Sequence, residues 1–206
     1  MSSVPIINVV VTIAVPIFIA ELTDKDALLL LSLATRYKPW LVFAAGSVAF
    51  TITSAIIVTL GRVLISFVPV AWISFAGGLI MICYGTWSIY QTDRNEEETR
   101  EIERKLAAKA SADMASVFLS AVGLLVLLDL AGDATEVLTI LFVARFRDVL
   151  LVFISAVAAL IGATAVETGV GNRLGRVLRP RRVMIFSSLV FWVIGSIAIL
   201  SALFHF

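Results

Sequence analysis

The chain has 206 residues, of which 60% are hydrophobic, and a formal net charge of +1. Its mean hydropathy of +1.04 excludes an ordinary soluble domain and indicates a protein that crosses a membrane several times. One cysteine, Cys83, and one histidine, His205, exclude a disulfide framework, a thiolate metal site and a His-rich zinc or haem site.

The first apolar run extends from about Val4 to Thr35. It lacks the basic start of a signal peptide and is too long to be one, so we expect it to remain as a membrane span. An acidic cluster, Glu21–Asp26 (ELTDKD), lies inside this run. A span of about 30 residues with charges in its middle is expected to be tilted, kinked or broken near those charges.

Two further spans follow, from about Trp40 to Leu60 and from about Val70 to Tyr90. Gly77 and Gly78 in the third span are expected to permit close helix packing. The next segment, Asp93–Asp113, carries five basic and seven acidic residues. Several opposite charges in it are four residues apart, which predicts a solvated, partly ion-paired helix that links the two halves of the chain.

The fourth predicted span, from about Ala115 to Ala144, contains a second acidic cluster, Asp129–Glu136 (DLAGDATE). The fifth extends from about Val149 to Ala165 and the sixth from about Val183 to Phe204. The apolar runs are continuous rather than alternating, which argues against a transmembrane barrel. The sequence therefore predicts an all-α membrane protein with six transmembrane helices.

The two halves of the chain resemble each other. Asp24 and Asp133 are 109 positions apart, and the segments that follow them, 27–37 (ALLLLSLATRY) and 136–146 (EVLTILFVARF), share one pattern. Chance similarity between leucine-rich spans is the alternative explanation. With three spans in each half, the two copies run in opposite directions, and such inverted repeats place a transport site near the bilayer midplane. The predicted organisation is a first three-helix repeat at 1–90, a charged linker at 91–113 and a second three-helix repeat at 114–206.

The basic residues predict how the chain is oriented in the membrane. With the N-terminus outside, twelve of them fall on the inner side and three on the outer side, as the positive-inside rule requires. The inner set is Arg36, Lys38, Arg94, Arg100, Arg104, Lys105, Lys109, Arg173, Arg176, Arg179, Arg181 and Arg182; the outer set is Arg62, Arg145 and Arg147. We expect a multi-pass protein of the cell membrane with both termini outside.

The two acidic clusters are the most informative feature of the sequence. A carboxylate at the bilayer centre costs about 2.5–3.5 kcal/mol, and the clusters contain six. They are Glu21, Asp24, Asp26, Asp129, Asp133 and Glu136. Residues three or four apart share a helix face, so each cluster can direct at least two carboxylates to one point. Oxygen ligands suit a hard divalent cation such as Ca²⁺, Mn²⁺ or Mg²⁺, and protons can replace the metal when it leaves.

Other polar residues have two interpretations each. Lys25 belongs to the site or forms a structural ion pair with Glu21, and Glu167 is a gate or a solvated residue at the end of the fifth span. Hydroxyl groups complete the coordination shell, or they form ordinary hydrogen bonds to the backbone or between helices. The hydroxyl candidates are Thr51, Thr53, Ser54, Ser155 and Thr164.

The clusters resemble the paired motif E-x-G-D-[KR]-[ST] of the calcium/manganese cation–proton exchangers, which include Golgi manganese transporters and belong to the lysine-exporter superfamily. In the first copy Glu21, Asp24 and Lys25 match the motif, while Thr23 and Asp26 replace its glycine and its hydroxyl residue. The resemblance extends over nearly the whole chain, since it includes three spans, a charged inner loop and three more spans.

The second copy of the motif is less complete. Its matching residues are Gly132, Asp133 and Thr135. Leu130 replaces the motif's glutamate and Ala134 its basic residue, while Asp129, one position before Leu130, can restore the lost carboxylate on nearly the same face. Glu136 can also contribute. The departures make the site more anionic than the family pattern.

The resemblance implies exchange of Mn²⁺ or Ca²⁺ for protons by alternating access, with the motif acids as ligands and Thr135 in a supporting role. We expect no enzymatic activity, no prosthetic group and no nucleic-acid partner; the partners are the cation, protons and the lipid bilayer, and a homodimer is left open. One alternative is an exporter of a small organic solute such as an amino acid, for which Lys25 alone could bind a carboxylate. Another is a Mg²⁺-dependent intramembrane enzyme that acts on lipid phosphates, although no arginine or histidine accompanies the acids.

Overall fold

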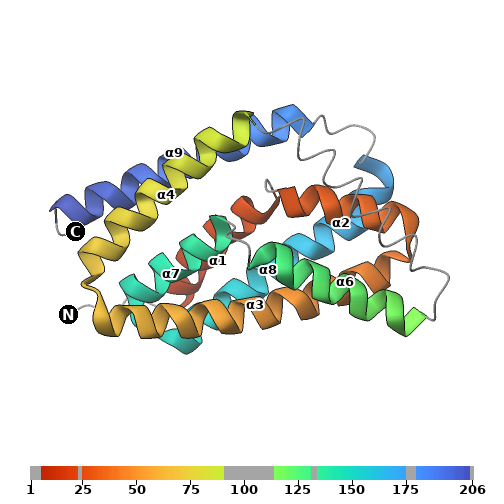
Figure 1. The fold of residues 1–206 in the computed structure, drawn as a ribbon, viewed down its shortest axis with the longest axis horizontal. Helices are drawn as coiled ribbons and strands as arrows, with labels where there is room; N and C mark the ends of the chain where they lie inside the picture. Colours follow the sequence, from red (N-terminus) through yellow and green to blue (C-terminus); the bar gives the residue numbers. More distant parts are fainter. Residues whose placement is uncertain (1–5, 23–24, 91–113, 131–133, 175–179, 205–206) are drawn as a thin grey trace.

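The computed structural model describes residues 6–22, 25–90, 114–130, 134–174 and 180–204 (Figure 1). These residues form helices joined by short turns, and no strand occurs among them. The all-α prediction is therefore confirmed, while the charged linker predicted at 91–113 lies outside the described residues. The helices are α1 (Ile6–Leu22), α2 (Lys25–Arg36), α3 (Pro39–Phe67), α4 (Val70–Tyr90), α6 (Met114–Asp129), α7 (Ala134–Phe146), α8 (Val149–Leu174) and α9 (Pro180–Phe204).

Both of the longest predicted spans are broken at their acidic clusters. The first divides into α1, which ends at Leu22, and α2, which begins at Lys25. The second divides into α6, which ends at Asp129, and α7, which begins at Ala134. Figure 1 shows that α1 and α6 both end near the middle of the long axis of the molecule. The prediction that these spans are interrupted near their charges is confirmed.

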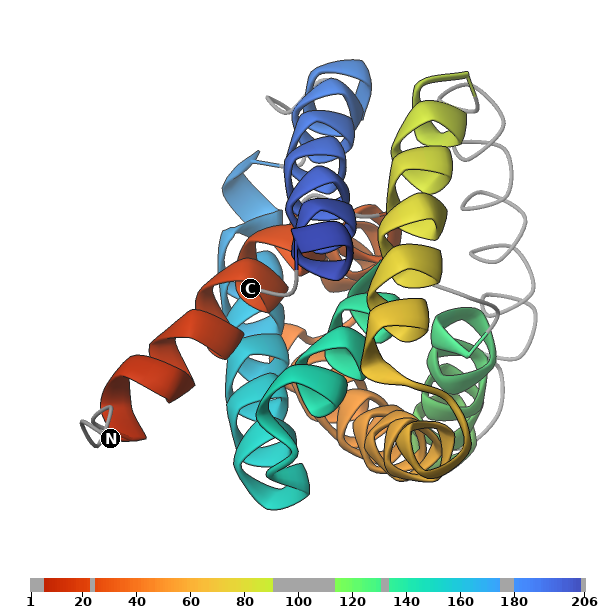
Figure 2. The ribbon, with the colours of Figure 1, turned by 90° about the vertical axis from the view of Figure 1, so that its left-hand side faces the viewer.

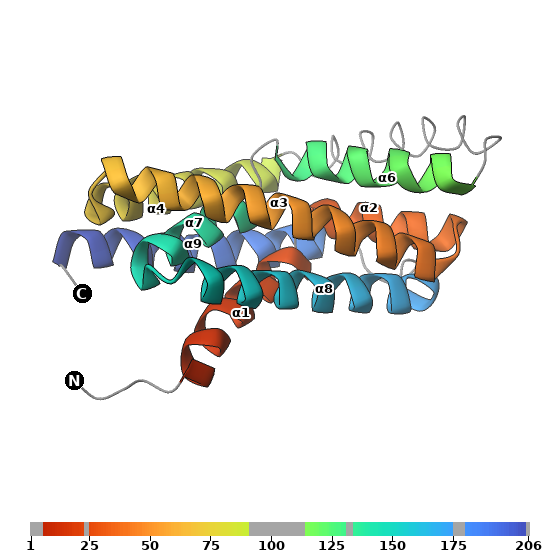
Figure 3. The ribbon, with the colours of Figure 1, turned by 90° about the horizontal axis from the view of Figure 1, so that it is seen from below.

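The two long helices α3 and α8 each pack against one of the broken helices. They pack against each other and run in opposite directions (Figure 3). The broken helix α1–α2 packs along α8, and the broken helix α6–α7 packs along α3. Exchange of the two halves of the chain therefore reproduces this packing, as an inverted repeat requires.

The burial of side chains along α3 and α8 follows the same repeat. Nine buried positions of α3 have a buried counterpart 110 residues later in α8. They are Val42, Ala45, Gly46, Ala49, Phe50, Thr53, Ser54, Ile57 and Val58 in α3, and Val152, Ser155, Ala156, Ala159, Leu160, Ala163, Thr164, Glu167 and Thr168 in α8. The shared spacing is that of one helix face, so both helices present equivalent faces to the centre of the protein.

Helices α4 and α9 form a second, closely packed pair (Figure 2). A Cβ added at Gly78 would lie 2.6 Å from the carbonyl oxygen of Gly195, and one added at Gly195 would lie 2.7 Å from that of Gly78. Ile199 Cγ1 lies 2.8 Å from the Cβ position of Gly78, and Ile82 Cγ1 lies 2.8 Å from the Cβ position of Gly195. Gly78 and Gly195 are 117 residues apart, and so are Ile82 and Ile199. The contacts on the two sides of the crossing are therefore equivalent, as a local two-fold axis requires. Gly77 and Gly78 both permit close packing, as predicted: Gly78 faces α9, and a Cβ at Gly77 would lie 2.8 Å from Leu141 of α7.

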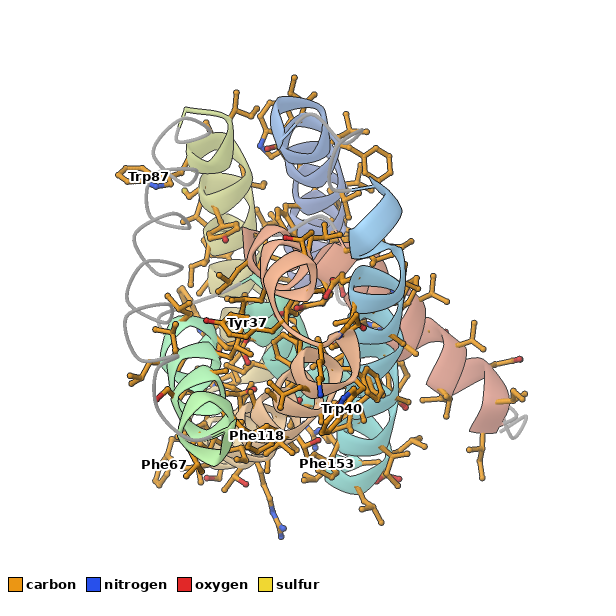
Figure 4. The ribbon with its side chains drawn as sticks, turned by 90° about the vertical axis from the view of Figure 1, so that its right-hand side faces the viewer. Tyr37, Trp40, Phe67, Trp87, Phe118 and Phe153 are labelled. Carbon is orange, nitrogen blue, oxygen red and sulfur yellow. The ribbon has the colours of Figure 1, made fainter. Side chains whose placement is uncertain are left out.

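The outer surface of the bundle carries large apolar side chains. Phe67 and Trp87 are 81% and 63% exposed, and both lie at the periphery in Figure 4. Since water would make such exposure costly, this surface suits the hydrocarbon of a bilayer.

Among the described residues, three helices are long and apolar enough to cross a membrane. They are Pro39–Phe67, Val70–Trp87 and Val149–Gly169. Three shorter apolar helices are Ile6–Leu22, Phe118–Asp129 and Ser188–Phe204. The predicted ends of the second and fifth spans, Leu60 and Ala165, were too early, because α3 and α8 continue to Phe67 and Leu174. A charged residue ends an apolar run but not the helix that contains it.

The α4–α9 contact predicts a specific sensitivity to added volume. Replacement Gly78→Ala should lower the stability by roughly 1–3 kcal/mol, because its Cβ meets backbone atoms that cannot move aside alone. Gly123→Ala in α6 is the matched control, since a Cβ there meets nothing within 4 Å. Thermal unfolding of the detergent-solubilised protein measures both. Equal melting temperatures for the two variants would contradict the close contact.

Candidate functional site

Glu21 and Asp129 occupy equivalent positions at the ends of two half-helices. Both are buried, with 0% and 3% of their surface exposed. Three buried residues of α1 have buried counterparts 108 positions later in α6. The pairs are Ile13 and Ala121, Ile17 and Leu125, and Glu21 and Asp129. Asp129, rather than the motif position Leu130, therefore corresponds in burial to Glu21.

The ends of α1 and α6 are chemically suited to a cation. The last four carbonyl groups of a helix have no partner within it, and the helix dipole makes this end negative. Glu21 lies in the last turn of α1, and Asp129 is the last residue of α6. Each half thus combines a buried carboxylate with a negative helix end, which is the arrangement that discontinuous helices use to coordinate cations in transporters.

The two broken helices contact each other. Contacts join α1 to α7 and α2 to α6, so each broken helix touches the other on both sides of its break. Thr135 and Glu136 lie in the first turn of α7 and are buried, with Glu136 9% exposed. The dipole at this end of α7 favours a negative side chain. Glu21, Asp129 and Glu136 therefore lie at ends of half-helices that contact the other broken helix.

Glu167 is a further buried acid, so of its two interpretations the solvated residue at the end of the fifth span is wrong. Its side chain is 2% exposed because α8 continues well past the predicted end of the fifth span. The equivalent position of α3 is the apolar Ile57. The sequence repeat could have revealed the burial of Glu167, because it aligns Glu167 with the apolar residue Ile57.

Contacts around α8 place Glu167 on the side of the first helix break. Phe18 of α1, one turn before Glu21, lies 3.5 Å from a Cβ built at Gly162. A Cβ built at Gly46 of α3 would lie 2.9 Å from Thr164 of α8 and 3.3 Å from Leu30 of α2. This turn of α8 therefore packs against α1 before the break and α2 after it, and Glu167 lies one helical turn beyond Thr164 on the same buried face.

The predicted hydroxyl ligands are mostly engaged with the backbone. Thr51, Ser155 and Thr164 donate to carbonyl oxygens four residues earlier, at 2.7 to 2.8 Å. Thr53 donates to the carbonyl of Phe50 at 3.3 Å. Ser54 is buried on the central face of α3. Backbone bonding, one of the two alternatives for these hydroxyls, is therefore what the structure shows for Thr51, Thr53, Ser155 and Thr164.

Part of the predicted ligand set lies outside the described residues. Asp24 and Asp133 fall between the half-helices, and the side chains of Lys25 and Asp26 are likewise not described. Within the described ranges, no three acidic, histidine or cysteine side chains form a complete metal site. The ligand role of the predicted acids therefore stays a prediction, with Glu21, Asp129 and Glu136 placed near the breaks.

Comparison with known proteins gives one match. The family model of the divalent cation/proton antiporter GDT1 matches the chain in two segments, residues 9–96 and 117–205. Each segment contains one broken helix and one acidic cluster. Curated proteins and solved structures gave no match.

Proposed function

Because the chain belongs to the GDT1 family of divalent cation/proton antiporters, we propose that it exchanges Mn²⁺ or Ca²⁺ for protons at the two helix breaks. The observation that carries this proposal is the equivalence of Glu21 and Asp129. Both are buried carboxylates at the negative ends of half-helices, and both belong to broken helices that contact each other. Asp24, Asp26, Asp133 and Glu136 complete the proposed ligand set.

The choice of cation follows from the available ligands. Carboxylate and backbone carbonyl oxygens prefer hard cations, and such a site accommodates Ca²⁺ or Mn²⁺ without sulfur or imidazole ligands. The family match supports this reading over an exporter of an organic solute and over an enzyme that acts on lipid phosphates.

Exchange follows from competition for the same oxygens. A metal ion or protons can neutralise the carboxylates, and only a neutralised cluster is inexpensive in a low-dielectric interior. An empty, fully charged site is therefore disfavoured while the protein changes conformation. We propose that the two inverted halves rock about the Gly78–Gly195 crossing, where they meet with reciprocal contacts, so that the site faces one side of the membrane at a time.

The proposal predicts that neutral variants at the equivalent acids lose exchange. In proteoliposomes with an internal pH dye, the unmodified protein should move protons when Mn²⁺ is added. Glu21→Gln and Asp129→Asn should each reduce this flux by about a hundredfold or more, equivalent to about 2.7 kcal/mol in the barrier. Both variants should bind Mn²⁺ more weakly. Mn²⁺ should therefore no longer raise their melting temperatures, because an ion stabilises the folded protein only when it binds to it.

Asp148→Asn is the matched control for these variants. It removes the same charge from an exposed residue before α8, and asparagine can still accept the hydrogen bond that Asp148 Oδ1 accepts from Leu151 N–H at 3.0 Å. Its flux should equal that of the unmodified protein. Retained Mn²⁺-dependent flux in folded Glu21→Gln or Asp129→Asn would refute the assignment.

Glu167 is proposed as an additional proton-carrying group of the same pathway. Its burial on the face of α8 that packs beside the first break supports this role, as does the apolar residue at the equivalent position of α3. Glu167→Gln should retain stabilisation by Mn²⁺ while proton-coupled flux falls by about tenfold or more, equivalent to about 1.4 kcal/mol. Glu167→Asp, which keeps an ionisable group, should recover flux. Full activity of Glu167→Gln would exclude the role.

In the proposed orientation both termini lie on the outer side of the cell membrane. The α3–α4 and α7–α8 connections lie at one end of the bundle and the α2–α3 connection lies at the other (Figure 1). In a Cys83→Ser background, Phe67→Cys should react with a membrane-impermeant maleimide on intact cells, and Lys38→Cys only after permeabilisation. The opposite labelling pattern would show that the protein is inserted the other way.

A further inference from the structure

Two arginines line a cavity at the end of the bundle that is remote from the α2–α3 connection. The cavity has a volume of about 500 Å³ and is open to the surroundings. Its lining residues are Arg62, Ile65, Phe146, Arg147, Asp148, Val149 and Leu150, from α3, the end of α7 and the start of α8. A second cavity, of about 310 Å³, adjoins it at Arg147 and also borders Arg145.

Arg147 has a backbone conformation that its residue type does not favour. Its φ of 55° is the only positive value among the described non-glycine residues, and glycine or asparagine is the usual choice in this region. Lys38, in the short α2–α3 connection of the first repeat, has an ordinary φ of −60°. Among the described connections, the left-handed turn therefore occurs at this end of the bundle, and it is occupied by an arginine that lines the cavity.

The charges in the cavity are not balanced within the described part of the chain. There, the guanidinium groups of Arg62 and Arg147 have no hydrogen-bond or ion-pair partner. The carboxylate of Asp148 accepts a hydrogen bond from Leu151 N–H as a helix cap. Arg145 donates to Ser201 Oγ at 3.4 Å in the adjoining cavity. The cavity therefore has an excess of positive charge and two guanidinium groups available for an anion.

The cavity lies where a lipid headgroup would be found. At 1.5 Å per residue, the 29-residue helix α3 is longer than the hydrocarbon core of about 30 Å. Its last turns, which carry Arg62, can therefore reach the level of the phosphates. Leu150 in the cavity wall and Phe67 nearby on α3 are 67% and 81% exposed, which suits contact with acyl chains.

We propose that this cavity binds the phosphate of an anionic phospholipid, with Arg62 and Arg147 as the charged contacts and the apolar wall against the glycerol and acyl groups. Guanidinium groups bind phosphate oxygens in a bidentate manner. The apolar wall favours a lipid over free phosphate, which would leave that wall exposed. The site is independent of the cation exchange proposed at the helix breaks, which lie near the middle of the bundle.

The test compares lipids by native mass spectrometry and thermal unfolding of the purified full chain. Phosphatidylglycerol should bind to and stabilise the protein more than phosphatidylcholine does, and inorganic phosphate or glycerol 3-phosphate should not reproduce the effect. The double variant Arg62→Gln/Arg147→Gln should weaken phosphatidylglycerol binding by roughly tenfold or more. Arg147→Gly should weaken it too without loss of folding, because glycine favours the left-handed turn.

Lys38→Gln provides the control, since it removes one positive charge from an exposed residue at the opposite end of the bundle. It should leave the preference for phosphatidylglycerol unchanged. The proposal is overturned if the double variant retains that preference, if Lys38→Gln weakens it equally, or if inorganic phosphate stabilises the protein as much as the lipid does. None of these outcomes depends on Mn²⁺ exchange, so failure of one proposal leaves the other intact.

Discussion

Ionisable side chains in a low-dielectric interior need polar neighbours or a bound cation, and this requirement is met where two helices of this protein end. A continuous helix would keep its carbonyl groups hydrogen-bonded along the axis and unavailable to a ligand. In this protein α1 and α6 end at Leu22 and Asp129, so Glu21 and Asp129 lie in the last turns of these helices. Helix α8 packs against one broken helix and α3 against the other, and contacts between α1 and α7 and between α2 and α6 join the two broken helices.

The internal repeat explains why the rest of the bundle is arranged as it is. Equivalent faces of α3 and α8 are buried 110 residues apart, and the glycines of α4 and α9 meet with matching distances. The differences between the halves are chemical. Glu167 replaces an apolar residue equivalent to Ile57, and Glu136 corresponds to Ala27 in the first half. Among the described residues, the second half therefore carries two buried acids, Glu136 and Glu167, where the first half has Ala27 and Ile57.

The sequence predicted the helices, their interruption and the repeat, because apolar runs and acidic residues are local features. It also predicted that Asp129 lies on nearly the same helix face as the motif's glutamate position, and the burial of Asp129 matches that of Glu21. It misjudged Glu167, since the end of an apolar run does not reveal that α8 continues and remains buried by α1, α2 and α3. The Arg62–Arg147 cavity was also beyond sequence reasoning, because it depends on a left-handed turn and on contact between residues more than 80 positions apart.

The most direct test of the account is the position of a bound metal. Anomalous diffraction from crystals soaked in Mn²⁺ would locate the ion and identify its ligands in one experiment. The account predicts a single strong peak between the ends of α1 and α6, with carboxylate oxygens from both halves of the chain, Glu21 and Asp129 among them. Two separate peaks, or one peak whose ligands come from a single half, would contradict a shared cation site.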